Sequence, residues 1–211
     1  PVYIENDANA AALGEALAGA GKGTNSCVCI TLGTGVGSGV VLNGKVYGGF
    51  NFAASEIGHT VIVVDGEPCT CGRNGCWEAY ASATALVRQT KAAMDAHPDS
   101  KMHAVAQEHG RVSGRTAFDA MRLGDAAAKQ VVDTYIGYVA CGLTNVINIF
   151  QPEVVCVGGG ICNEGDTLLV PLKQKIEQDR YSKYSVHQSR LCVATLGNDA
   201  GIIGAAFLGN E

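Results

Sequence analysis

A close-set group of metal-ligand residue types is the feature that most restricts how this chain can fold. The group consists of one histidine and three cysteines, namely His59, Cys69, Cys71 and Cys76. One imidazole and three thiolates are a complete ligand set for a closed, tetrahedral zinc site. Gly72 and Gly75 let the backbone reverse between the cysteines, so that their sulfur atoms can converge on one ion. We therefore predict that this segment folds around a structural zinc ion.

The alternative interpretation is three unrelated core cysteines, which would pack as small hydrophobic side chains. It is disfavoured because the cysteines share a polar loop with glycines rather than an apolar run. Structural zinc contributes roughly 10 kcal/mol to folding in peptides, so ligation should stabilise this segment outright. Two carboxylates, Glu56 and Glu78, flank the group although structural zinc does not require them. The metal is therefore expected to shape a binding pocket. The second nitrogen of a zinc-bound histidine usually donates to a carboxylate, a carbonyl or water, but if that of His59 faces a cleft it can bind a ligand hydroxyl, with the tautomer fixed by the metal.

The composition indicates a globular protein with a sizeable core. Of the 211 residues 47% are apolar, and the length suits one large domain or two small ones. The net charge is −5, with 15 basic against 20 acidic residues, which disfavours nucleic-acid binding by this part of the protein. The most apolar stretch, 135–150, is interrupted by polar residues and is too short to span a bilayer. No signal peptide opens the chain, and we expect no membrane association.

The chain has nine cysteines, an odd number. Those outside the predicted zinc group are Cys27, Cys29, Cys141, Cys156, Cys162 and Cys192. Most of them lie in apolar strands or helices, where a free thiol packs as a small hydrophobic group. A secreted disulfide framework therefore fits poorly, and a reducing cytoplasm fits well.

Periodicity and turn residues predict an α/β domain. Strands are expected at residues 2–5, 26–32, 38–42, 45–47, 60–64, 154–157 and 191–195. Helices are expected from the cap at residue 6 or 7 to residue 20, and at 77–97, 104–109, 116–123, 125–150, 167–178 and 200–208. An apolar stripe at three- and four-residue steps marks the helix 125–150 as facing the core. Strands, then helices, then strand–loop–helix units describe a mixed sheet covered by helices.

The run Asn6-Asp7-Ala8-Asn9 lies at an expected strand-to-helix junction and has two interpretations. Asn and Asp are common helix N-caps, so capping alone explains one of them. Two amides around a carboxylate at the carboxyl end of a strand also suit ligand binding, because α/β sheets bind ligands there. The residues alone favour neither interpretation.

Two glycine-rich loops follow strands of the predicted sheet. In the first, 33–39, alternate glycines let backbone N–H groups and the Thr and Ser hydroxyls approach a phosphate, and a tight glycine hairpin is the alternative. Ser38 occupies the third slot of Gly-x-Gly-x-x-Gly, and no Walker A motif occurs in the chain. The second loop, Gly158-Gly159-Gly160, precedes a helix and suits a nucleotide lying across it or, equally, a loop shaped by packing.

Four motifs in this order resemble those of the ROK family, named for repressors, open reading frames and kinases. They are Asn6-Asp7-Ala8-Asn9-Ala10-Ala11, Leu32-Gly33-Thr34-Gly35-Val36-Gly37-Ser38-Gly39, Glu56-Ile57-Gly58-His59 and Cys69-Thr70-Cys71-Gly72-Arg73-Asn74-Gly75-Cys76-Trp77-Glu78. The zinc segment is highly specific, and the resemblance covers essentially the whole chain. Among family members the chain is most similar to bacterial glucokinases. The resemblance implies an actin-like ATPase (sugar kinase) fold, of which this chain is the large C-terminal lobe with a mixed sheet, helices and a zinc loop.

The resemblance also implies roles for single residues. Asp7 matches the catalytic base, which takes the proton from the sugar hydroxyl that attacks the γ-phosphate of ATP. The positions that match sugar-binding residues are Asn6, Glu56, His59 and Glu78. The positions that match nucleotide-binding segments are Gly33, Thr34 and Gly35 for phosphate, and Gly158 and Gly159 for adenosine. Carboxylates, an amide and an oriented imidazole suit a sugar because each hydroxyl both donates and accepts hydrogen bonds.

The sequence departs from the family pattern at its start. A full member begins with an N-terminal lobe whose Asp-x-Gly-x-Thr loop holds the ATP phosphates and Mg²⁺, and no such loop occurs here. We therefore expect residues 1–211 to be the C-terminal lobe, with a terminal helix within 199–211 that docks on the missing lobe. Alone, the chain is expected to fold and bind zinc without turning over ATP.

The resemblance leaves several functions open. The leading hypothesis is ATP-dependent phosphorylation of a hexose, most simply of the 6-hydroxyl of glucose, because sensing a sugar does not require a base such as Asp7. The alternative is a sugar-sensing transcriptional repressor of the same family, which binds DNA through an N-terminal helix-turn-helix. A third is a zinc-stabilised sugar-binding module without chemistry. The sequence does not decide the hexose or the phosphoryl donor (ATP or polyphosphate), and the resemblance suggests a homodimer formed through this lobe.

Overall fold

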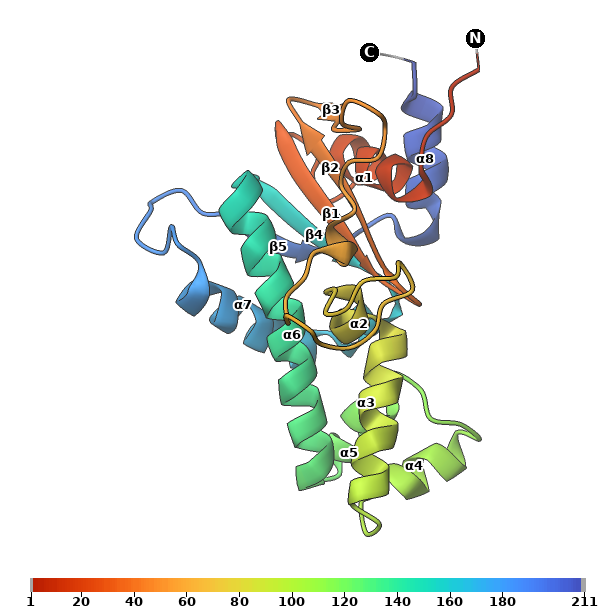
Figure 1. Cartoon of the computed structure of the whole chain (residues 1–211). Helices are drawn as coiled ribbons and strands as arrows, with labels where there is room; N and C mark the ends of the chain where they lie inside the picture. The colour runs from red at the N-terminus through yellow and green to blue at the C-terminus, as the bar shows by residue number, and fades with distance from the viewer. Residues whose placement is uncertain (1, 210–211) are drawn as a thin grey trace.

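The computed structural model describes residues 2–209, and this part of the chain contains eight α-helices and one five-stranded sheet (Figure 1). The strands are β1 (Ser26–Leu32), β2 (Val36–Leu42), β3 (Lys45–Val46), β4 (Val154–Gly158) and β5 (Arg190–Val193). The helices are α1 (Asp7–Ala18), α2 (Glu78–Ala81), α3 (Ala83–Ala96), α4 (Met102–Glu108), α5 (Thr116–Arg122), α6 (Ala126–Phe150), α7 (Asp166–Asp179) and α8 (Ala200–Phe207). Pro1 and the last two residues of the expected segment 199–211 lie outside the described residues.

The sheet is mixed, as predicted, with the strand order β3-β2-β1-β4-β5. β1 pairs antiparallel with β2, and β2 pairs antiparallel with β3. β1, β4 and β5 run parallel, with Cys29 opposite Cys156 and Cys156 opposite Cys192. Because parallel strands end at the same edge of a sheet, the loops that follow β1, β4 and β5 lie at one edge, where α/β proteins bind ligands.

Alternate side chains of β1 enter two separate cores, because successive strand residues face opposite sides of a sheet. Val28, Ile30 and Leu32 belong to the larger core, together with side chains of α6 and α7. Cys27 and Cys29 belong to a smaller core that also contains side chains of α1. A strand covered on both faces needs no polar face, which explains the continuous apolar run of β1. Figure 1 shows α1 and α8 together on one side of the sheet and α6 with α7 on the other.

Helices α3, α4 and α5 lie away from the sheet, at the opposite end of the molecule from α1 and α8 (Figure 1). The long helix α6 joins the two parts, since it packs against α3 and α5 as well as α7. Its predicted apolar stripe is buried at Val132, Ile136, Val139, Leu143 and Val146. None of the described helices is both long enough and apolar enough to cross a membrane.

Two of the expected strands are wrong. Residues 2–5 are irregular, because no strand of the described chain lies beside them and their apolar side chains are exposed. Residues 60–64 make a single isolated bridge, between Val61 and Cys76, because the chain there follows the cysteine loop rather than the sheet. In both segments the strand-like composition is real, but a strand forms only where a partner strand is available.

One expected helix is divided. The pattern over 77–97 forms α2 and α3, separated by Ser82, whose backbone is extended. The hydroxyl of Ser82 accepts a hydrogen bond from the N–H of Ala85 at 3.1 Å and so caps α3. The remaining helices and strands agree with the expected ones to within two residues at either end.

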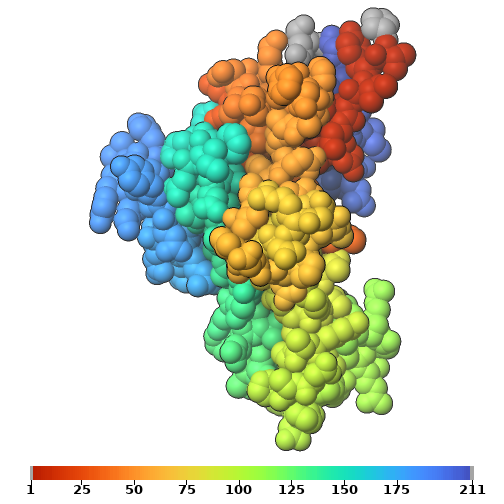
Figure 2. All heavy atoms as spheres, viewed as in Figure 1, coloured from red at the N-terminus to blue at the C-terminus, as the bar shows by residue number. Residues whose placement is uncertain are grey.

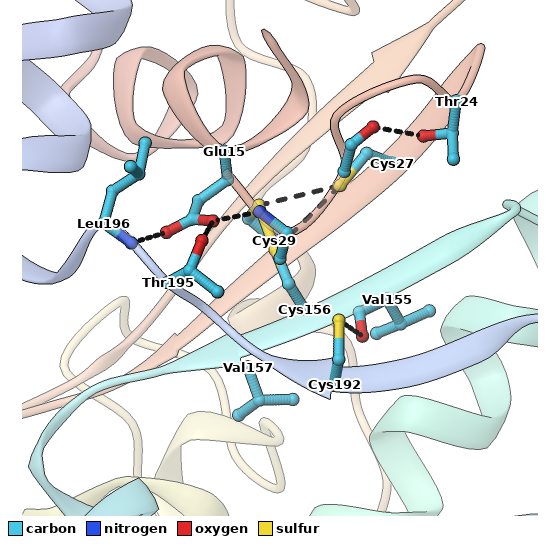
Figure 3. The surroundings of a disulfide bond; sticks show 12 residues. Glu15, Thr24, Cys27, Cys29, Val155, Cys156, Val157, Cys192, Thr195 and Leu196 are labelled. Atoms are coloured by element: carbon cyan, nitrogen blue, oxygen red, sulfur yellow. Dashed lines mark hydrogen bonds between the residues drawn. A yellow bond between two sulfur atoms is a disulfide. The ribbon is translucent and has the colours of Figure 1, made fainter. Parts of the chain in front are cut away.

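Two of the six cysteines outside the zinc group depart from the expected packing as free thiols. Cys29 and Cys156 form a disulfide between the neighbouring strands β1 and β4, with their Cα atoms 4.8 Å apart (Figure 3). The sulfur of Cys27 lies 3.9 Å from each of the two bonded sulfur atoms. Burial raises the pKa of the Cys27 thiol to about 12, so this thiol stays protonated and unreactive at neutral pH. Sequence spacing does not indicate the bonded pair, because its members are 127 positions apart and only the sheet register brings them together.

Gly142 allows α6 to lie directly against the buried indole of Trp77, because a Cβ atom at this position would come within 3.0 Å of the ring. We expect Gly142→Ala to lower the free energy of unfolding by at least about 1–3 kcal/mol, the usual range for overpacking a core. Gly137→Ala lies in the same helix with nothing within 4 Å of the added carbon. It should instead raise the free energy of unfolding by about 0.5–1 kcal/mol, since Ala is the better helix former. Urea unfolding measures both changes, and equal stabilities of the two variants would contradict the packing described.

Candidate functional site

Eight of the residues singled out in the sequence line a single cavity of about 560 Å³. They are Asn6, Asp7, Gly33, Thr34, Gly35, Glu56, His59 and Glu78. The cavity lies at the carboxyl end of β1, beside the start of α1 and the connection from β1 to β2. Its volume is in the usual range of small-molecule sites. Segments far apart in the sequence therefore bring three carboxylates and an imidazole to one pocket.

Asn6 and Asp7 lie at the start of α1, at the edge of this cavity. Asn6 caps the helix, because its Oδ1 accepts from the N–H of Ala8 at 2.8 Å and from the N–H of Asn9 at 3.3 Å. Capping and lining the cavity are thus not alternatives, since the same residue does both. Asp7 is exposed, and among the described residues its carboxylate accepts only from the N–H of Ala8, at 2.8 Å. The rest of that carboxylate is available to a ligand.

Hydrogen bonds from the start of α3 hold the connection between β1 and β2 in place. The N–H of Ala83 donates to the carbonyl oxygen of Gly33 at 2.8 Å, and the hydroxyl of Thr84 donates to that of Thr34 at 2.8 Å. At Gly35 an added Cβ atom would come within 3.0 Å of the Glu78 carboxylate, so a larger residue there would displace that side chain. Beside Gly33 the space is open, because an added Cβ atom would meet nothing within 4 Å. The glycines of this connection therefore serve different purposes, and only some of them leave room for a ligand.

Glu78 joins this connection to the cysteine loop. Its Oε2 accepts from the N–H of Val36 at 2.9 Å. Its Oε1 accepts from the hydroxyl of Thr70 at 3.3 Å and from the thiol of Cys69 at 3.7 Å. Glu78 also lies in the first turn of α2, where the free N–H groups of a helix favour negative charge. The carboxylate is thus fixed in position before any ligand binds.

Glu56 reaches the cavity from just before a short 3-10 helix, Ile57–His59, that is fastened to β2. The hydroxyl of Ser38 donates to the carbonyl oxygen of Ser55 and accepts from the N–H of Ile57 at 3.1 Å. This hydroxyl therefore holds the segment that carries Glu56, and it is not free to act as the phosphate contact suggested by the sequence. Sequence reasoning missed this positioning role, because the two segments meet only in the folded chain.

The predicted metal ligands, His59, Cys69, Cys71 and Cys76, form one cluster beside the cavity, and their four ligand atoms lie within 4.8 Å of one another. Nδ1 of His59 is 3.5 Å from the sulfur of Cys69, and the sulfur atoms of Cys71 and Cys76 are 3.6 Å apart. Two sulfur atoms bound to zinc at tetrahedral angles are about 3.8 Å apart, and a sulfur and an imidazole nitrogen about 3.5 Å. The four residues therefore fit a tetrahedral zinc ion. His59 lines the cavity, and ligation through its Nδ1 would leave Nε2 for a ligand.

Glycines shape the loop that carries the three thiols, as predicted. Gly72 and Gly75 have φ angles of 90° and 80°, values that glycine adopts without strain. The N–H of Gly72 donates to the carbonyl oxygen of Cys69 at 3.0 Å, and the N–H of Cys69 donates to that of Arg73 at 2.9 Å. Figure 2 shows this part of the chain, coloured orange to gold, on the surface between the sheet and helices α3 to α5.

The cysteines of the cluster have contrasting surroundings. Cys76 is fully buried, and burial raises the pKa of its thiol to about 12. Cys71 is exposed, and a hydrogen bond from the backbone N–H of Arg73 is the main cause that lowers the pKa of its thiol. A metal ion that binds here must displace the proton of Cys76, because thiolates rather than thiols are the ligands.

A second cavity, of about 440 Å³, lies at the same edge of the sheet and contains Gly158 and Gly159, the predicted adenosine contacts. Gly159 has a φ angle of 100°, and a Cβ atom there would come within 3.0 Å of the carbonyl oxygen of Leu32. This glycine is therefore required by both backbone conformation and packing. The lining residues common to the two cavities are Ala11, Thr31, Gly197 and Asn198. The two cavities are thus adjacent and share a wall.

Two polar side chains of this shared wall, Thr31 and Asn198, were not singled out by the sequence. Thr31 is the last polar residue before the first glycine connection, and that position at a strand end could have drawn attention to it. Asn198 lies in the loop after β5, where only the sheet order brings it beside the other residues. No sequence signal distinguishes it.

Carboxylates and an imidazole around one cavity, a glycine connection at a strand end and a cluster of four possible metal ligands suit a binding site for a polyhydroxylated ligand. The chain belongs to the ROK family, because the sequence pattern of that family matches residues 1–211. Its fold is that of the ROK sugar kinases, part of the actin-like ATPase fold.

Named relatives fall into two groups. A glucokinase of Halalkalibacterium halodurans is 43% identical over 99% of this chain, which spans 63% of that protein's length. The chain is also similar to the crystal structure of a ROK family glucokinase from Streptomyces griseus in complex with glucose and AMPPNP, with 38% sequence identity and a TM-score of 0.86. The match includes 100% of this chain and 68% of that one. A xylose repressor of Bacillus spizizenii is 30% identical over 99% of this chain, which spans 50% of that protein.

Proposed function

We propose that the whole protein is an ATP-dependent hexose kinase that converts glucose to glucose 6-phosphate. The observation that carries the proposal is the single cavity that contains Asp7, Glu56, His59 and Glu78 beside the glycine connection after β1. Similarity to the glucokinase of Halalkalibacterium halodurans, at 43% identity, supports the same reaction and sugar. The related Streptomyces griseus structure, which holds glucose and AMPPNP, supports a nucleotide as phosphoryl donor.

In the proposed reaction Asp7 is the general base. Its carboxylate takes the proton of the sugar 6-hydroxyl as that oxygen bonds to the γ-phosphorus, and the bond from the γ-phosphorus to the bridging oxygen of ADP breaks. A positioned base of this kind typically contributes about 10²–10⁴-fold to the rate, and positioning and charge stabilisation supply the rest. The remaining sugar hydroxyls would bond to the amide of Asn6, the carboxylates of Glu56 and Glu78, and Nε2 of His59.

The nucleotide would lie across the second cavity, with its adenosine against Gly158 and Gly159 and its phosphates directed to Gly33, Thr34 and Gly35. The wall shared by the two cavities supports this arrangement, because it allows the γ-phosphate to reach the sugar. Mg²⁺ bound with the nucleotide would neutralise the charge of the phosphates.

This chain spans 63% of the Halalkalibacterium relative. We propose that residues 1–211 are a C-terminal lobe and that a further lobe holds the ATP phosphates and Mg²⁺. The segment 199–211 would dock on that lobe. One face of α8 packs on α1, while Ile202 on the same helix is 73% exposed and available for such a contact.

We propose that the metal of the cysteine cluster is zinc and that it serves the sugar site indirectly. The ligand set and the distances within the cluster favour zinc. Zinc on Nδ1 of His59 would fix Nε2 as the free nitrogen. The hydrogen bond from the hydroxyl of Thr70 to Glu78 links the same loop to a second sugar-binding side chain.

ADP release by the whole protein tests the proposed function. We expect turnover on glucose to exceed turnover on mannose, fructose, N-acetylglucosamine and N-acetylmannosamine, because the named relatives at 43% and 38% identity are glucokinases. The isolated chain of residues 1–211 should release no ADP above a mock preparation. Strongest turnover on another hexose would retain the kinase and change the sugar. Absence of turnover on all of them would contradict the kinase proposal.

A sugar-sensing transcriptional repressor is the second candidate. The xylose repressor of Bacillus spizizenii, 30% identical over 99% of this chain, favours it. The whole protein would then bind sugar in the same cavity and release DNA without turning over ATP. Retention of Asp7 with an open face to the cavity favours the kinase, because sensing needs no base. For either function we propose a homodimer formed through this lobe, as the family resemblance implies.

A further inference from the structure

Glu15, in the middle of α1, is a carboxylate buried without a cation. The residue is 2% exposed, and it makes no ion pair with any described residue. Oε1 accepts from the N–H of Leu196 at 2.7 Å. Oε2 accepts from the N–H of Ala20 at 2.8 Å and from the hydroxyl of Thr195 at 3.2 Å (Figure 3). Hydrogen bonds to an ionised acceptor are roughly twice as strong as neutral ones, so three of them can hold a buried charge.

These bonds tie α1 to the loop that follows β5. Leu196 and Thr195 belong to this loop, which continues through Gly197 and Asn198 to α8. Gly197 and Asn198 line both cavities and form part of the wall between them. Glu15 therefore holds, through two neighbouring residues, the backbone that separates the proposed sugar and nucleotide sites.

The same helix carries Asp7 at its start, eight residues before Glu15, or about 12 Å along the axis at 1.5 Å per residue. α1 is therefore a rigid spacer between Asp7 and the loop after β5. A shift of that loop relative to α1 would move the wall that the two cavities share, without moving Asp7. Glu15 also lines the second cavity, but both of its carboxylate oxygens accept hydrogen bonds from donors of the protein.

We propose that Glu15 is a positioning residue that sets the affinity for the phosphoryl donor by fixing the loop 195–198. This inference rests on the proposed kinase function and deepens it. It assigns nucleotide affinity to a side chain that belongs to α1, the helix that carries the proposed base.

The test is steady-state kinetics of Glu15→Gln in the whole protein. Gln keeps the volume of the side chain and one accepting oxygen. Its NH₂ group, however, would face either the N–H of Leu196 or the two donors to Oε2, so that at least one hydrogen bond is lost. We expect the KM for ATP to rise about tenfold, because the loop beside the second cavity loses one of the charged hydrogen bonds that fix it. The KM for glucose and kcat should change less than about threefold, because Asp7 and the sugar side chains stay in place.

Asp125→Asn is the matched control. Asp125 is another buried carboxylate that accepts three hydrogen bonds, from the N–H groups of Lys101 and Ala128 and the hydroxyl of Ser100. Asp125 caps the start of α6, which lies near α4 and α5 and away from the sheet, and it lines neither cavity. This variant should lose stability without a change in either KM.

The outcomes separate the inference from the proposed function. An equal rise of both KM values in Glu15→Gln, or the same change in Asp125→Asn, would overturn the positioning role and leave the kinase intact. If the wild-type protein turns over no sugar, titration with ADP replaces the kinetics. Tenfold weaker ADP binding by Glu15→Gln would then support the role although the kinase is lost. Unchanged ADP affinity, or no ADP binding by the wild-type protein, would overturn it.

Discussion

Replacing Asp7 with Asn in the whole protein is expected to lower kcat by about 10²–10⁴-fold, the usual contribution of a general base. The KM for glucose should stay within a few-fold of the wild-type value, because Asn retains the size and polarity of the side chain. The helix should also be retained, since Asn6 rather than Asp7 supplies the cap. Steady-state ADP release with glucose as the acceptor measures both quantities.

Asp133→Asn is the control for this variant. Asp133 is an exposed carboxylate of α6 that pairs with Lys129 at 2.5 Å and lines neither cavity. Its replacement should leave kcat and both KM values unchanged. A kcat of Asp7→Asn within threefold of the wild type would exclude Asp7 as the base, whatever the sugar. A large rise in the KM for glucose with kcat unchanged would make it a binding residue instead.

Loss of the metal is the second change with a large expected effect. We expect Cys76→Ser, or extraction with a strong chelator, to lower the free energy of unfolding by several kcal/mol, since structural zinc contributes roughly 10 kcal/mol in peptides. Sugar affinity should fall with it, because His59 and Glu78 both depend on the cysteine loop. Elemental analysis gives the metal content, thermal unfolding the stability, and calorimetric titration with glucose the affinity.

Cys141→Ser provides the comparison for the cysteine change, because Cys141 is exposed on α6 and belongs to no ligand cluster of the described residues. Its metal content, stability and glucose affinity should match the wild type. Zinc added back after chelation should restore both stability and affinity. A wild-type protein that contains no stoichiometric metal, or an unchanged melting temperature after chelation, would contradict a structural zinc.

Much of the fold could be predicted because local signals and tertiary structure agree. β1 is an apolar run because both of its faces are covered, and α6 shows a regular stripe because one of its faces meets the core. The errors arise where local preference lacked its tertiary partner. Residues 2–5 have strand-like side chains but no neighbouring strand in the described chain, and residues 60–64 are held by the cysteine loop.

The part of the candidate site that consists of short sequence motifs could be predicted. The residues around Asp7, Gly33, His59 and Cys76 occur in compact patterns, and the fold brings them to one cavity and one cluster. Residues that act through a long-range contact carry no such pattern. Ser38 holds the segment of Glu56, although its glycine-rich motif suggested a phosphate contact instead. Glu15 holds the loop after β5, yet in the sequence it looks like an ordinary helix residue.

The disulfide between Cys29 and Cys156 was unpredictable for a related reason. Both residues fit an apolar strand, and composition favoured a free thiol at each position. The pairing depends on the parallel register of β1 and β4, which only the complete sheet defines. Sequence spacing can indicate which cysteines of one loop lie together, such as Cys71 and Cys76. It cannot indicate a pair on two strands that are joined by a long connection.

The pairing of β1 with β4 also has a consequence for the order in which the molecule is made. It joins residues 127 positions apart, so it cannot form until all the helices from α2 to α6 have been synthesised. Most of the first cavity comes from residues 6–78, whereas the second depends on β4 and β5. Contacts this distant in the chain form slowly. During synthesis most residues of the first cavity are therefore present early, whereas Gly197 and Asn198, which complete both cavities, are made near the end.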